Sequence, residues 1–438
     1  MVPNPTLMQA VEKLDYRVTV GDVAAQAGLD INLAQQGLLA LASDAGGHLQ
    51  VAESGEVVYL FPKNFRNVLR NKFLRLRLQE WWNRIWRVLF YLIRISFGIL
   101  LLVSIALIVV AIALIVLSLN SSRDNDNGND SGGGGGIFVP NFWFTPDFFW
   151  IFYPNYYDRP YERRRRRSRN SEPNQLNFLE AIFSFLFGDG NPNADLEERR
   201  WQAIGTVIRN HRGAVVAEQI APYLDDVGKG YGYQYEDYMI PVLSRFNGRP
   251  EVSPEGGIVY HFPELQTTVA QHRPRSVSAY LEETPWRFSA AGAGQIILAT
   301  GLGGLNLVGA LVLGSLLADG TVAAELGGLV AFVQSIYWLL LGYGTAFLAI
   351  PLVRYFWIQW RNSQIAIRNQ NRRQRALKLN QAEPELQRKL AYAEKFAAET
   401  VVTQEDLVYT TETDLLEQEV ERSDDIDAEW QRRLNESR

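Results

Sequence analysis

Three long stretches without a charged residue constrain this chain more than any other feature: residues 95–119, 288–318 and 326–353. As a helix, residues 95–119 would rise about 37 Å, which is enough to cross a hydrocarbon core of roughly 30 Å. Only Asp319 and Glu325 carry charge between the second and third stretches, so these two stretches predict a membrane hairpin with a short loop. The sequence therefore predicts an integral, mainly α-helical membrane protein and excludes a simple soluble globule.

A fourth segment, residues 137–153, is apolar and aromatic but contains two prolines and Asp147. Three basic clusters, residues 63–94, 159–169 and 354–378, surround the apolar segments. The positive-inside rule places all three clusters on the cytoplasmic side, which requires an even number of crossings between successive clusters. We therefore predict four crossings, with residues 137–153 forming a broken or partial span. The alternative with three spans leaves the last basic cluster on the opposite side.

The first basic cluster interleaves cations with aromatic residues, a pattern typical of a helix that lies on anionic lipid before it enters the membrane. A nucleic-acid-binding stripe has a similar composition, but the adjacent span favours lipid. The residues predicted at the membrane interface are Arg70, Lys72, Arg75, Arg77, Trp81, Trp82, Arg84, Trp86 and Arg87. A run of five arginines is predicted to anchor the topology: Arg163, Arg164, Arg165, Arg166 and Arg167.

The chain contains an internal similarity. Residues 38–62 and 239–263 align without a gap at an offset of 201, with eight of 25 positions identical, and they end in VAESGEVVYLFP and VSPEGGIVYHFP. At the same offset, the residues before the first apolar stretch align with the start of the second stretch. Residues 137–153 align close to the third stretch. We interpret this as a tandem duplication of a small soluble domain followed by a membrane hairpin.

Each small domain has the pattern helix, helix, helix, β-hairpin, which is the order of a winged helix-turn-helix. The helices are expected at 7–14, 21–27 and 32–43 in the first copy, and at 201–210, 217–224 and 235–246 in the second. Turns at Gly55 and Gly256 separate the two strands of each hairpin. Pro241 is expected to kink the third helix of the second copy.

The charges of these domains argue against DNA binding. Residues 1–64 carry seven acidic residues and three Lys or Arg, and residues 201–265 carry eight and five. The third helix of the first copy has no cation, and Arg245 is the cation of the equivalent helix in the second. Because each phosphate contact needs a cation, we do not expect nucleic acid as a partner. An acidic winged helix instead suits docking of a basic protein.

The sequence shows none of the common catalytic or metal-binding motifs. The chain has no cysteine, which excludes a disulfide framework, a thiolate zinc site and cysteine catalysis, and its four histidines do not have metal-ligand spacing. The segment FGDGNPN at 187–193 is similar to a calcium loop, but Ala194 and Arg200 replace the required glycine and bidentate acid. We interpret it as a turn before a helix, and we predict no enzyme activity, no cofactor and no metal site.

The predicted organisation follows from these patterns. It comprises a winged-helix domain (1–64), a basic interfacial linker (65–94), a first membrane region (95–155), a basic and amphipathic linker (156–194), a second winged-helix domain (195–265), a membrane hairpin (288–353) and a basic then acidic tail (354–438). Val401–Arg438 carries twelve acidic residues and four arginines, so we expect much of it to be disordered and available for docking.

Four segments together resemble a known family: GEVVYLFPKNFR (55–66), RISFG (94–98), FGDGNPN (187–193) and GGIVYHFPELQ (256–266). They are similar to an uncharacterised membrane protein family of cyanobacteria with a chloroplast counterpart in plants, from residue 1 to about residue 378. Members are sometimes labelled as iron–sulfur cluster biosynthesis proteins. The resemblance implies a photosynthetic membrane, thylakoid or plasma membrane, with the soluble domains facing the cytoplasm. It supplies no catalytic residues.

The sequence therefore favours an integral membrane scaffold or assembly factor. Its expected partners are the lipid bilayer and proteins whose identity the sequence does not indicate, and self-association into a homo-oligomer stays open. One alternative is a membrane-tethered DNA-binding transcription regulator. Another is a transport or lipid-handling protein, which would require Asp147, Gln295 or Asn306 to line a polar cavity between the spans.

Overall fold

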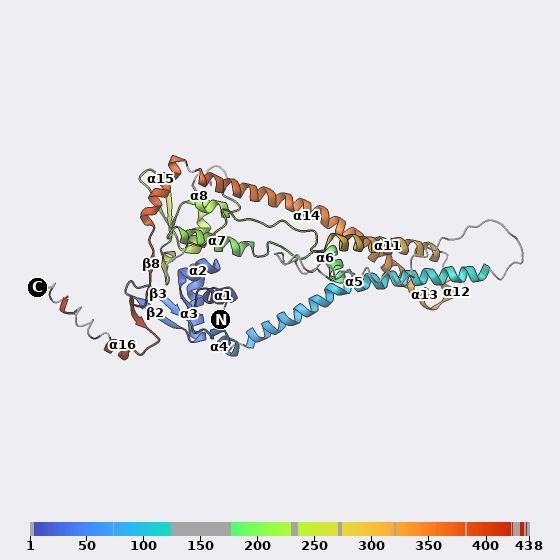
Figure 1. The fold of residues 1–438 in the computed structure, drawn as a ribbon, viewed down its shortest axis with the longest axis horizontal. Coiled ribbons are helices and arrows are strands. Elements are labelled where there is room, and N and C mark those ends of the chain that lie inside the picture. Colours follow the sequence, from blue (N-terminus) through green and yellow to red (C-terminus); the bar gives the residue numbers. More distant parts are fainter. Residues whose placement is uncertain are drawn as a thin grey trace, which may run out of the picture. The chain divides into compact units, whose positions relative to one another are not determined.

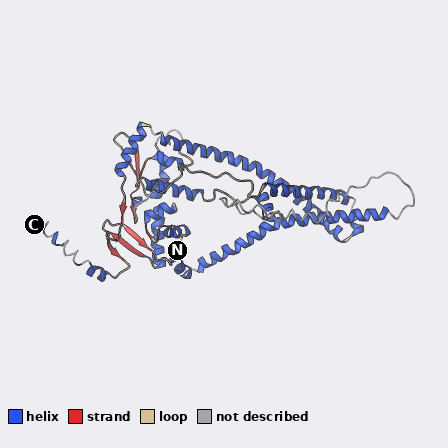
Figure 2. Cartoon of the chain, in the orientation of Figure 1, coloured by secondary structure: helices blue, strands red, loops and turns tan. Residues whose placement is uncertain are grey.

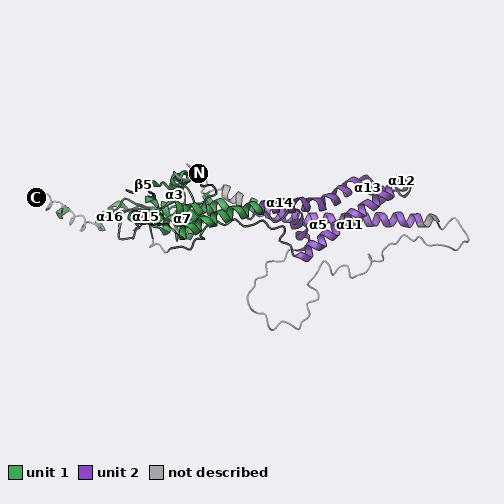
Figure 3. Cartoon of the chain, turned by 90° about the horizontal axis from the view of Figure 1, so that it is seen from above, with its two compact units in different colours: residues 1–83, 192–285, 362–438 green, residues 84–191, 286–361 purple. Residues whose placement is uncertain are grey.

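The computed structural model describes residues 4–72, 74–123, 177–228, 235–269, 274–318, 321–381, 383–421, 423, 430–432 and 435. In this part the chain is mainly helical, and its strands all lie in one of two units (Figure 2). Unit 1 comprises Met1–Asn83, Pro192–Pro285 and Asn362–Arg438, and unit 2 comprises Arg84–Asn191 and Trp286–Arg361 (Figure 3). The chain therefore contributes three separate stretches to unit 1 and two to unit 2.

Unit 2 contains the apolar parts of the long helices. Among the described residues, three helices are long and apolar enough to cross a membrane: α5 (Leu74–Arg123), α11 (Ala293–Leu317) and α14 (Tyr337–Asn380) (Figure 1). A short apolar helix, α6 (Phe178–Phe187), packs against α11. Two glycines of α11 allow close helix packing, because a Cβ at Gly303 would lie 2.4 Å from the Phe347 ring and one at Gly314 would lie 2.0 Å from the Tyr337 hydroxyl.

Two boundaries differ from those expected. The basic linker is helical as α4 (Phe65–Lys72) and the first turns of α5, and α5 continues into the apolar stretch without a break at residue 94. The third apolar stretch is divided between α13 (Gly328–Ser335) and α14, with α12 (Thr321–Leu326) before it. Gly327 and Gly328, with φ of 54° and 49°, separate α12 from α13 because their left-handed backbone cannot continue a helix. Residues 137–153 lie outside the described residues.

In the N-terminal module of unit 1, side chains close in sequence cap the starts of the helices. Its elements are α1 (Pro5–Lys13), β1 (Arg17–Thr19), α2 (Val20–Ala27), α3 (Ile31–Ala45), β2 (His48–Ala52) and β3 (Val57–Leu60). Thr19 and Asp22 form a capping box at the start of α2, and Gly28 ends it in the left-handed conformation. Asp30 caps α3 by accepting from the backbone of Asn32 and Leu33. Leu7, Val11, Leu38 and Phe61 lie in the core of the module.

The second module of unit 1 has the same order of helices and strands. It contains α7 (Leu196–Asn210), β4 (Ala214–Val215), α8 (Ala217–Ile220), η3 (Ala221–Tyr223), η4 (Asp237–Met239), α10 (Ile240–Phe246), β5 (Arg249–Val252), β6 (Ile258–His261), η5 (Pro263–Leu265) and β7 (Thr267–Thr268). Pro241 does not kink a helix as expected. It lies in the first turn of α10, where proline leaves no unmade intrahelical hydrogen bond. Ile208, Phe246 and Phe262 are fully buried in the core.

The sheets of the two modules have matching registers. Their strand orders are β1-β3-β2, extended by β9, and β4-β6-β5. His48 pairs with Leu60 in one sheet and Arg249 with His261 in the other, which is the same pair shifted by 201 residues. The hairpin glycines, Gly55 and Gly256, have φ of 84° and 85°. The aligned segments of the sequence therefore form the same hairpin.

The C-terminal segment packs on both sheets. It forms α15 (Pro384–Ala393), η6 (Glu394–Phe396), β8 (Thr400–Val401), β9 (Leu407–Thr410) and α16 (Leu415–Glu421). Strand β8 pairs with β7, and β9 adds a fourth strand to the N-terminal sheet beside β2. Val402 is 1% exposed against Ala52 and Val58. Residues 400–410 of the expected docking tail are therefore part of the fold.

Candidate functional site

The two modules contact each other inside unit 1 through α2 and α7. A Cβ atom at Gly205 of α7 would lie 2.8 Å from Ala25 Cα, so glycine permits this close approach. Asp22 and Arg209 form an ion pair across the contact, with side chains 3% and 12% exposed. Thr268 also donates to Asp22 Oδ1 at 3.1 Å. The capping carboxylate of α2 thus also holds the second module.

Arg245, the cation of α10, takes part in the contact between the two modules. Its Nε donates to the Gly28 carbonyl at 2.9 Å, and its guanidinium carbon lies 4.3 Å from the centre of the Trp201 ring. A cation committed to a carbonyl and an indole face is poorly placed to bind phosphate. Helix α10 of the second module therefore contributes to the contact between the modules.

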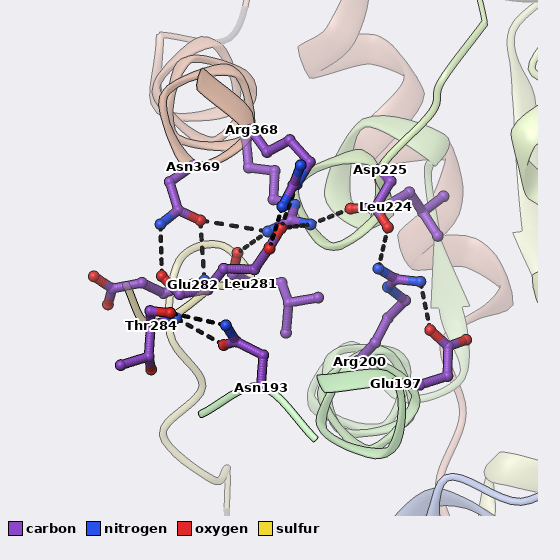
Figure 4. A network of polar contacts seen from close by, with 12 residues as sticks. Asn193, Glu197, Arg200, Leu224, Asp225, Leu281, Glu282, Thr284, Arg368 and Asn369 are labelled. Carbon is purple, nitrogen blue, oxygen red and sulfur yellow. Dashed lines mark hydrogen bonds and ion pairs between the residues drawn. The ribbon is translucent and has the colours of Figure 1, made fainter. Parts of the chain in front are cut away.

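An arginine network holds the end of α14 against the second module (Figure 4). Arg368 donates to both carboxylate oxygens of Glu283, at 2.8 and 2.6 Å. Arg372 donates to Glu283 Oε1 at 2.8 Å and to the Leu281 carbonyl at 2.9 Å. The side chains of Arg372 and Glu283 are 1% and 5% exposed. Both carboxylate oxygens of Glu283 are occupied by arginine, so the network is suited to holding segments together and not to proton transfer.

Asp225 joins the network from the other side of Arg372. Its carboxylate forms ion pairs with Arg372 and with Arg200 of α7 (Figure 4). Burial raises the pKa of Asp225, but the hydrogen bond from Arg372 and the charge of Arg200 outweigh it and hold the pKa below its ordinary value. The pKa of Glu283 is likewise lowered, because Arg368 and Arg372 outweigh its burial. Both groups are therefore ionised at neutral pH.

A second ion-pair group fixes α15. Lys389 Nζ lies 2.7 Å from Glu218 Oε1 and 2.7 Å from Glu236 Oε1. Tyr260 donates to the other oxygen of Glu236 at 2.8 Å. Burial lowers the pKa of Lys389, but the two carboxylates outweigh it and raise the pKa above its ordinary value. A lysine held charged in this way is not available as a general base.

The calcium-like segment 187–193 has a different role in unit 2. Asp189 accepts from Arg94 at 2.7 Å, from Ser184 at 2.6 Å and from the Ala290 backbone at 2.7 Å. The Asp189 carboxylate thus links α5 and the backbone before α11 to the end of α6. Among the described residues no group of three or more His, Asp or Glu side chains could hold a metal ion. The RISFG and FGDGNPN segments therefore meet at Arg94 and Asp189.

The residues predicted at the membrane interface fall into two groups. Arg70 and Lys72 lie on α4, whose Phe65 and Leu69 are buried in the N-terminal core, and Lys72 pairs with Asp44 at 2.7 Å. Arg75, Arg77, Arg84 and Arg87 lie along α5, where Trp81, Trp82 and Trp86 are 57%, 59% and 51% exposed. Arg163–Arg167 lie outside the described residues. Helix α4 thus belongs to unit 1, and the three tryptophans of α5 are exposed.

The polar residues considered for a transport path are engaged in local contacts. Asn306 of α11 is 1% exposed and donates to Ser104 of α5 at 2.7 Å. Gln295 caps the start of α11 by accepting from the Gly292 backbone at 3.1 Å. Asp147 lies outside the described residues. An amide–hydroxyl hydrogen bond between two apolar helices is a packing contact typical of membrane bundles.

The outer face of α3 carries two exposed leucines. Leu33 and Leu39 are 61% and 53% exposed, and the other exposed side chains between them, Gln35 and Gln36, are uncharged. On the opposite face, Leu38 and Leu41 are buried in the core. The sequence predicts a helix without cations here, but its closely spaced leucines do not show by themselves which of them are exposed. We call residues Leu33, Gln35, Gln36 and Leu39 the α3 face.

Comparison with known proteins places the chain in a family. It is 38% identical over 442 residues to an Arabidopsis thaliana protein described as uncharacterized and chloroplastic, covering 98% of this chain and 82% of the plant protein. The similarity therefore continues past residue 378, where the resemblance was expected to end. No family model and no solved structure matches the chain. At this identity and coverage, the chain belongs to the family of the Arabidopsis chloroplastic protein.

Proposed function

We propose that this protein is a membrane-anchored scaffold or assembly factor whose unit 1 docks partner proteins through the α3 face. The observation that carries the proposal is the exposure of Leu33 and Leu39 on a helix whose other exposed residues nearby are uncharged. Exposed leucines on one helix face favour an apolar protein partner over water or phosphate. The charged clusters described above are internally paired, which supports a binding role over a catalytic one.

We further propose that both modules are winged helices derived by duplication. The matching strand order, the registers related by 201 residues and the equivalent hairpin glycines support this. In a winged helix the third helix is the usual recognition surface. In the second module its counterpart, α10, contacts the first module through Arg245. The duplication thus leaves α3 as the recognition helix available to a partner.

The partner we propose is a protein segment with an apolar stripe flanked by basic residues. Residues 1–64 carry seven acidic residues against three basic ones, so a cationic partner gains favourable long-range attraction. We place the protein in a cyanobacterial photosynthetic membrane, thylakoid or plasma membrane, with unit 1 on the cytoplasmic side. The chloroplastic relative and the three apolar helices support this location. Because the chain lacks cysteine, the proposal includes no iron–sulfur ligation by this chain.

Site-specific photo-crosslinking tests the docking proposal. A photoreactive amino acid is placed at Leu33 or Leu39 of the full chain in its native membranes, and at Leu416, which is 70% exposed on α16, as the control. We expect discrete protein adducts from the two α3 positions and none of the same size from Leu416. Leu33→Glu with Leu39→Glu should reduce capture at a neighbouring probe by about tenfold or more, the size of a hot-spot loss, whereas Leu416→Glu should not.

The same experiment can contradict the proposal. Absence of protein adducts from the α3 face, or identical adducts from Leu416, would show that this face does not dock proteins. Adducts with nucleic acid that disappear at high salt would instead favour the membrane-tethered transcription regulator. Both leucines are exposed, so the glutamate variants should fold, and their thermal unfolding provides the check.

A further inference from the structure

Unit 1 contains a cavity of about 450 Å³ beside the arginine network. One wall is a face of α7, with Arg199, Gln202 and Thr206, and the opposite wall is the segment 275–284. Gln26 of α2 reaches the cavity from the first module. Its volume lies in the range of about 300–1,000 Å³ typical of small-molecule sites.

The segment 275–284 is fixed at both ends by asparagine side chains. Asn210, at the end of α7, donates to the Arg275 carbonyl at 2.9 Å and accepts from the Arg275 backbone at 3.1 Å. Asn193, before the start of α7, donates to the Thr284 carbonyl at 2.8 Å and accepts from the Thr284 backbone at 2.8 Å. The two carboxamides thus each form a paired hydrogen bond with one residue of the segment. Asn193, the last residue of the FGDGNPN motif, therefore has a structural role in holding this segment.

The middle of the segment is held as well. Tyr223 donates to the Ser278 carbonyl at 2.6 Å, and Leu281 donates from its backbone to the Pro222 carbonyl at 3.2 Å. Leu281 is 5% exposed and Glu283, two residues on, belongs to the arginine network. The wall of the cavity is therefore preformed, so a ligand would not have to order it on binding.

The lining of the cavity is polar and carries more positive than negative charge. Two arginines, Arg199 and Arg275, line it together with one acid, Glu282. Arg275 donates to Gln26 through one nitrogen. Arg199 pairs with Asp195 at 3.2 Å outside the cavity lining, and its Nη1 donates to the Glu282 carbonyl at 3.4 Å. Each guanidinium has five donors, so both keep donors for a ligand. The remaining lining supplies neutral polar groups: Gln26, Gln202, Thr206, Ser276, Ser278, Tyr223 and Tyr280.

We infer that this cavity binds a small phosphorylated polyhydroxy compound of sugar phosphate size. The positive charge of the two arginines complements a phosphate group, and each planar guanidinium can donate paired hydrogen bonds to two phosphate oxygens. Hydroxyl and carboxamide side chains match the hydroxyl groups of a sugar, and an inorganic phosphate ion alone would leave much of the volume unused. Because Gln26 and α7 belong to different modules, the ligand would contact both. The inference does not depend on docking at the α3 face.

Ligand-dependent thermal unfolding of the full chain in detergent tests the inference. The probes are glucose 6-phosphate, fructose 6-phosphate and ribose 5-phosphate, with glucose, ribose and inorganic phosphate as comparison compounds. We expect at least one sugar phosphate to raise the unfolding midpoint in a saturable way, with a dissociation constant at least about tenfold below those of its parent sugar and of inorganic phosphate.

Matched variants assign the effect to the cavity. Arg199→Gln and Arg275→Gln should each weaken sugar phosphate binding by about tenfold or more, whereas Arg388→Gln, at an exposed position of α15, should not. Arg199→Lys keeps the charge and should retain part of the affinity if the first variant unfolds. The inference is overturned if no sugar phosphate shifts the midpoint, if the parent sugar or inorganic phosphate acts equally well, or if both glutamine variants bind unchanged.

Discussion

At the residue scale, Glu283 is the side chain on which the arginine network depends most. Arg372 is 1% exposed and relies on Glu283 and Asp225 for its charge partners. Replacing one partner of a buried ion pair leaves an uncompensated charge and costs about 3–5 kcal/mol. We therefore expect Glu283→Gln to lower the free energy of unfolding of unit 1 by about that amount in denaturant titrations. The neighbouring Glu282→Gln, at an exposed position, should change it by less than about 0.5 kcal/mol. Equal losses in the two variants would contradict this role.

The same network predicts a pH dependence. The pKa values of Glu283 and Asp225 lie below their ordinary values of 4.5 and 3.8, because their arginine partners outweigh burial. A carboxyl whose pKa is lowered by folding stabilises the folded state above the ordinary pKa, and this contribution is lost as pH falls through the folded pKa. We expect the unfolding midpoint to be flat near neutral pH and to fall below about pH 4. In Glu283→Gln this fall should be shallower, and an unchanged profile would show that other groups cause it.

Individual residues show why the sequence could not predict these partners. The cluster at 354–378 was recognised as basic and assigned to topology, but Arg368 and Arg372 are bound by Glu283, more than 80 residues earlier. No local pattern marks such a pairing, since it depends on how α14 packs against the second module. The segment around Asp189 forms a bend and a turn before α7, as interpreted from the sequence, yet its partner Arg94 lies 95 residues earlier.

At the scale of elements, the two sheets protect their outer edges differently. In the N-terminal sheet, β9 covers β2, and the Leu49 carbonyl accepts from the Thr411 backbone at 2.9 Å. The equivalent residue of the second module, 201 positions later, is Pro250 on β5, which has no backbone N–H to offer another strand. A proline on an edge strand discourages pairing with other chains. Strand β9 thus covers the edge of the first sheet, whereas Pro250 removes a hydrogen-bond donor from the edge of the second. Both discourage pairing with another chain.

Truncation tests the covering role of the C-terminal strands. A stop after Ala398 removes β8, β9 and Val402, which exposes Ala52, Val58 and the edge of β2. We expect a loss of about 2–3 kcal/mol from the apolar burial alone, together with faster proteolysis and self-association on size-exclusion chromatography. A stop after Glu421 keeps both strands and serves as the control. If both truncated chains behave like the full chain, the strands do not contribute to stability.

The elements were predictable where local signals were strong. The hairpins followed from the repeated Gly55 and Gly256 turns, and the apolar helices from the absence of charge. The third helix of the second module is shorter than expected because it begins at Ile240, with Pro241 in its first turn. The strands β8 and β9 were not predicted, since an acidic segment forms strands only when a sheet edge is available to pair with it.

At the scale of the whole molecule, the three separate stretches of chain that form unit 1 constrain the membrane topology. Unit 1 includes residues before Asn83, between Pro192 and Pro285, and after Asn362. The chain therefore leaves this unit and returns to it twice. If α5, α11 and α14 cross the bilayer, each excursion must contain an even number of crossings for the two modules to meet as Asp22 and Arg209 do. The four crossings that we predict would satisfy this condition, whereas three would not. The sequence could not predict the contact between modules, because residues about 190 positions apart carry no shared signature.

Single-cysteine labelling tests this topology directly, and the natural chain has no cysteine to give a background signal. Ser54→Cys and Glu255→Cys place exposed thiols in the two equivalent hairpin turns, and Ala324→Cys places one in α12, between α11 and α14. In sealed vesicles of one orientation, a membrane-impermeant maleimide should label the first two positions together and leave Ala324→Cys protected. Vesicles of the opposite orientation should give the reverse pattern, and detergent should make all three accessible. Because both turns belong to unit 1, labelling of Ser54→Cys and Glu255→Cys from opposite sides would rule out four crossings and the shared unit alike.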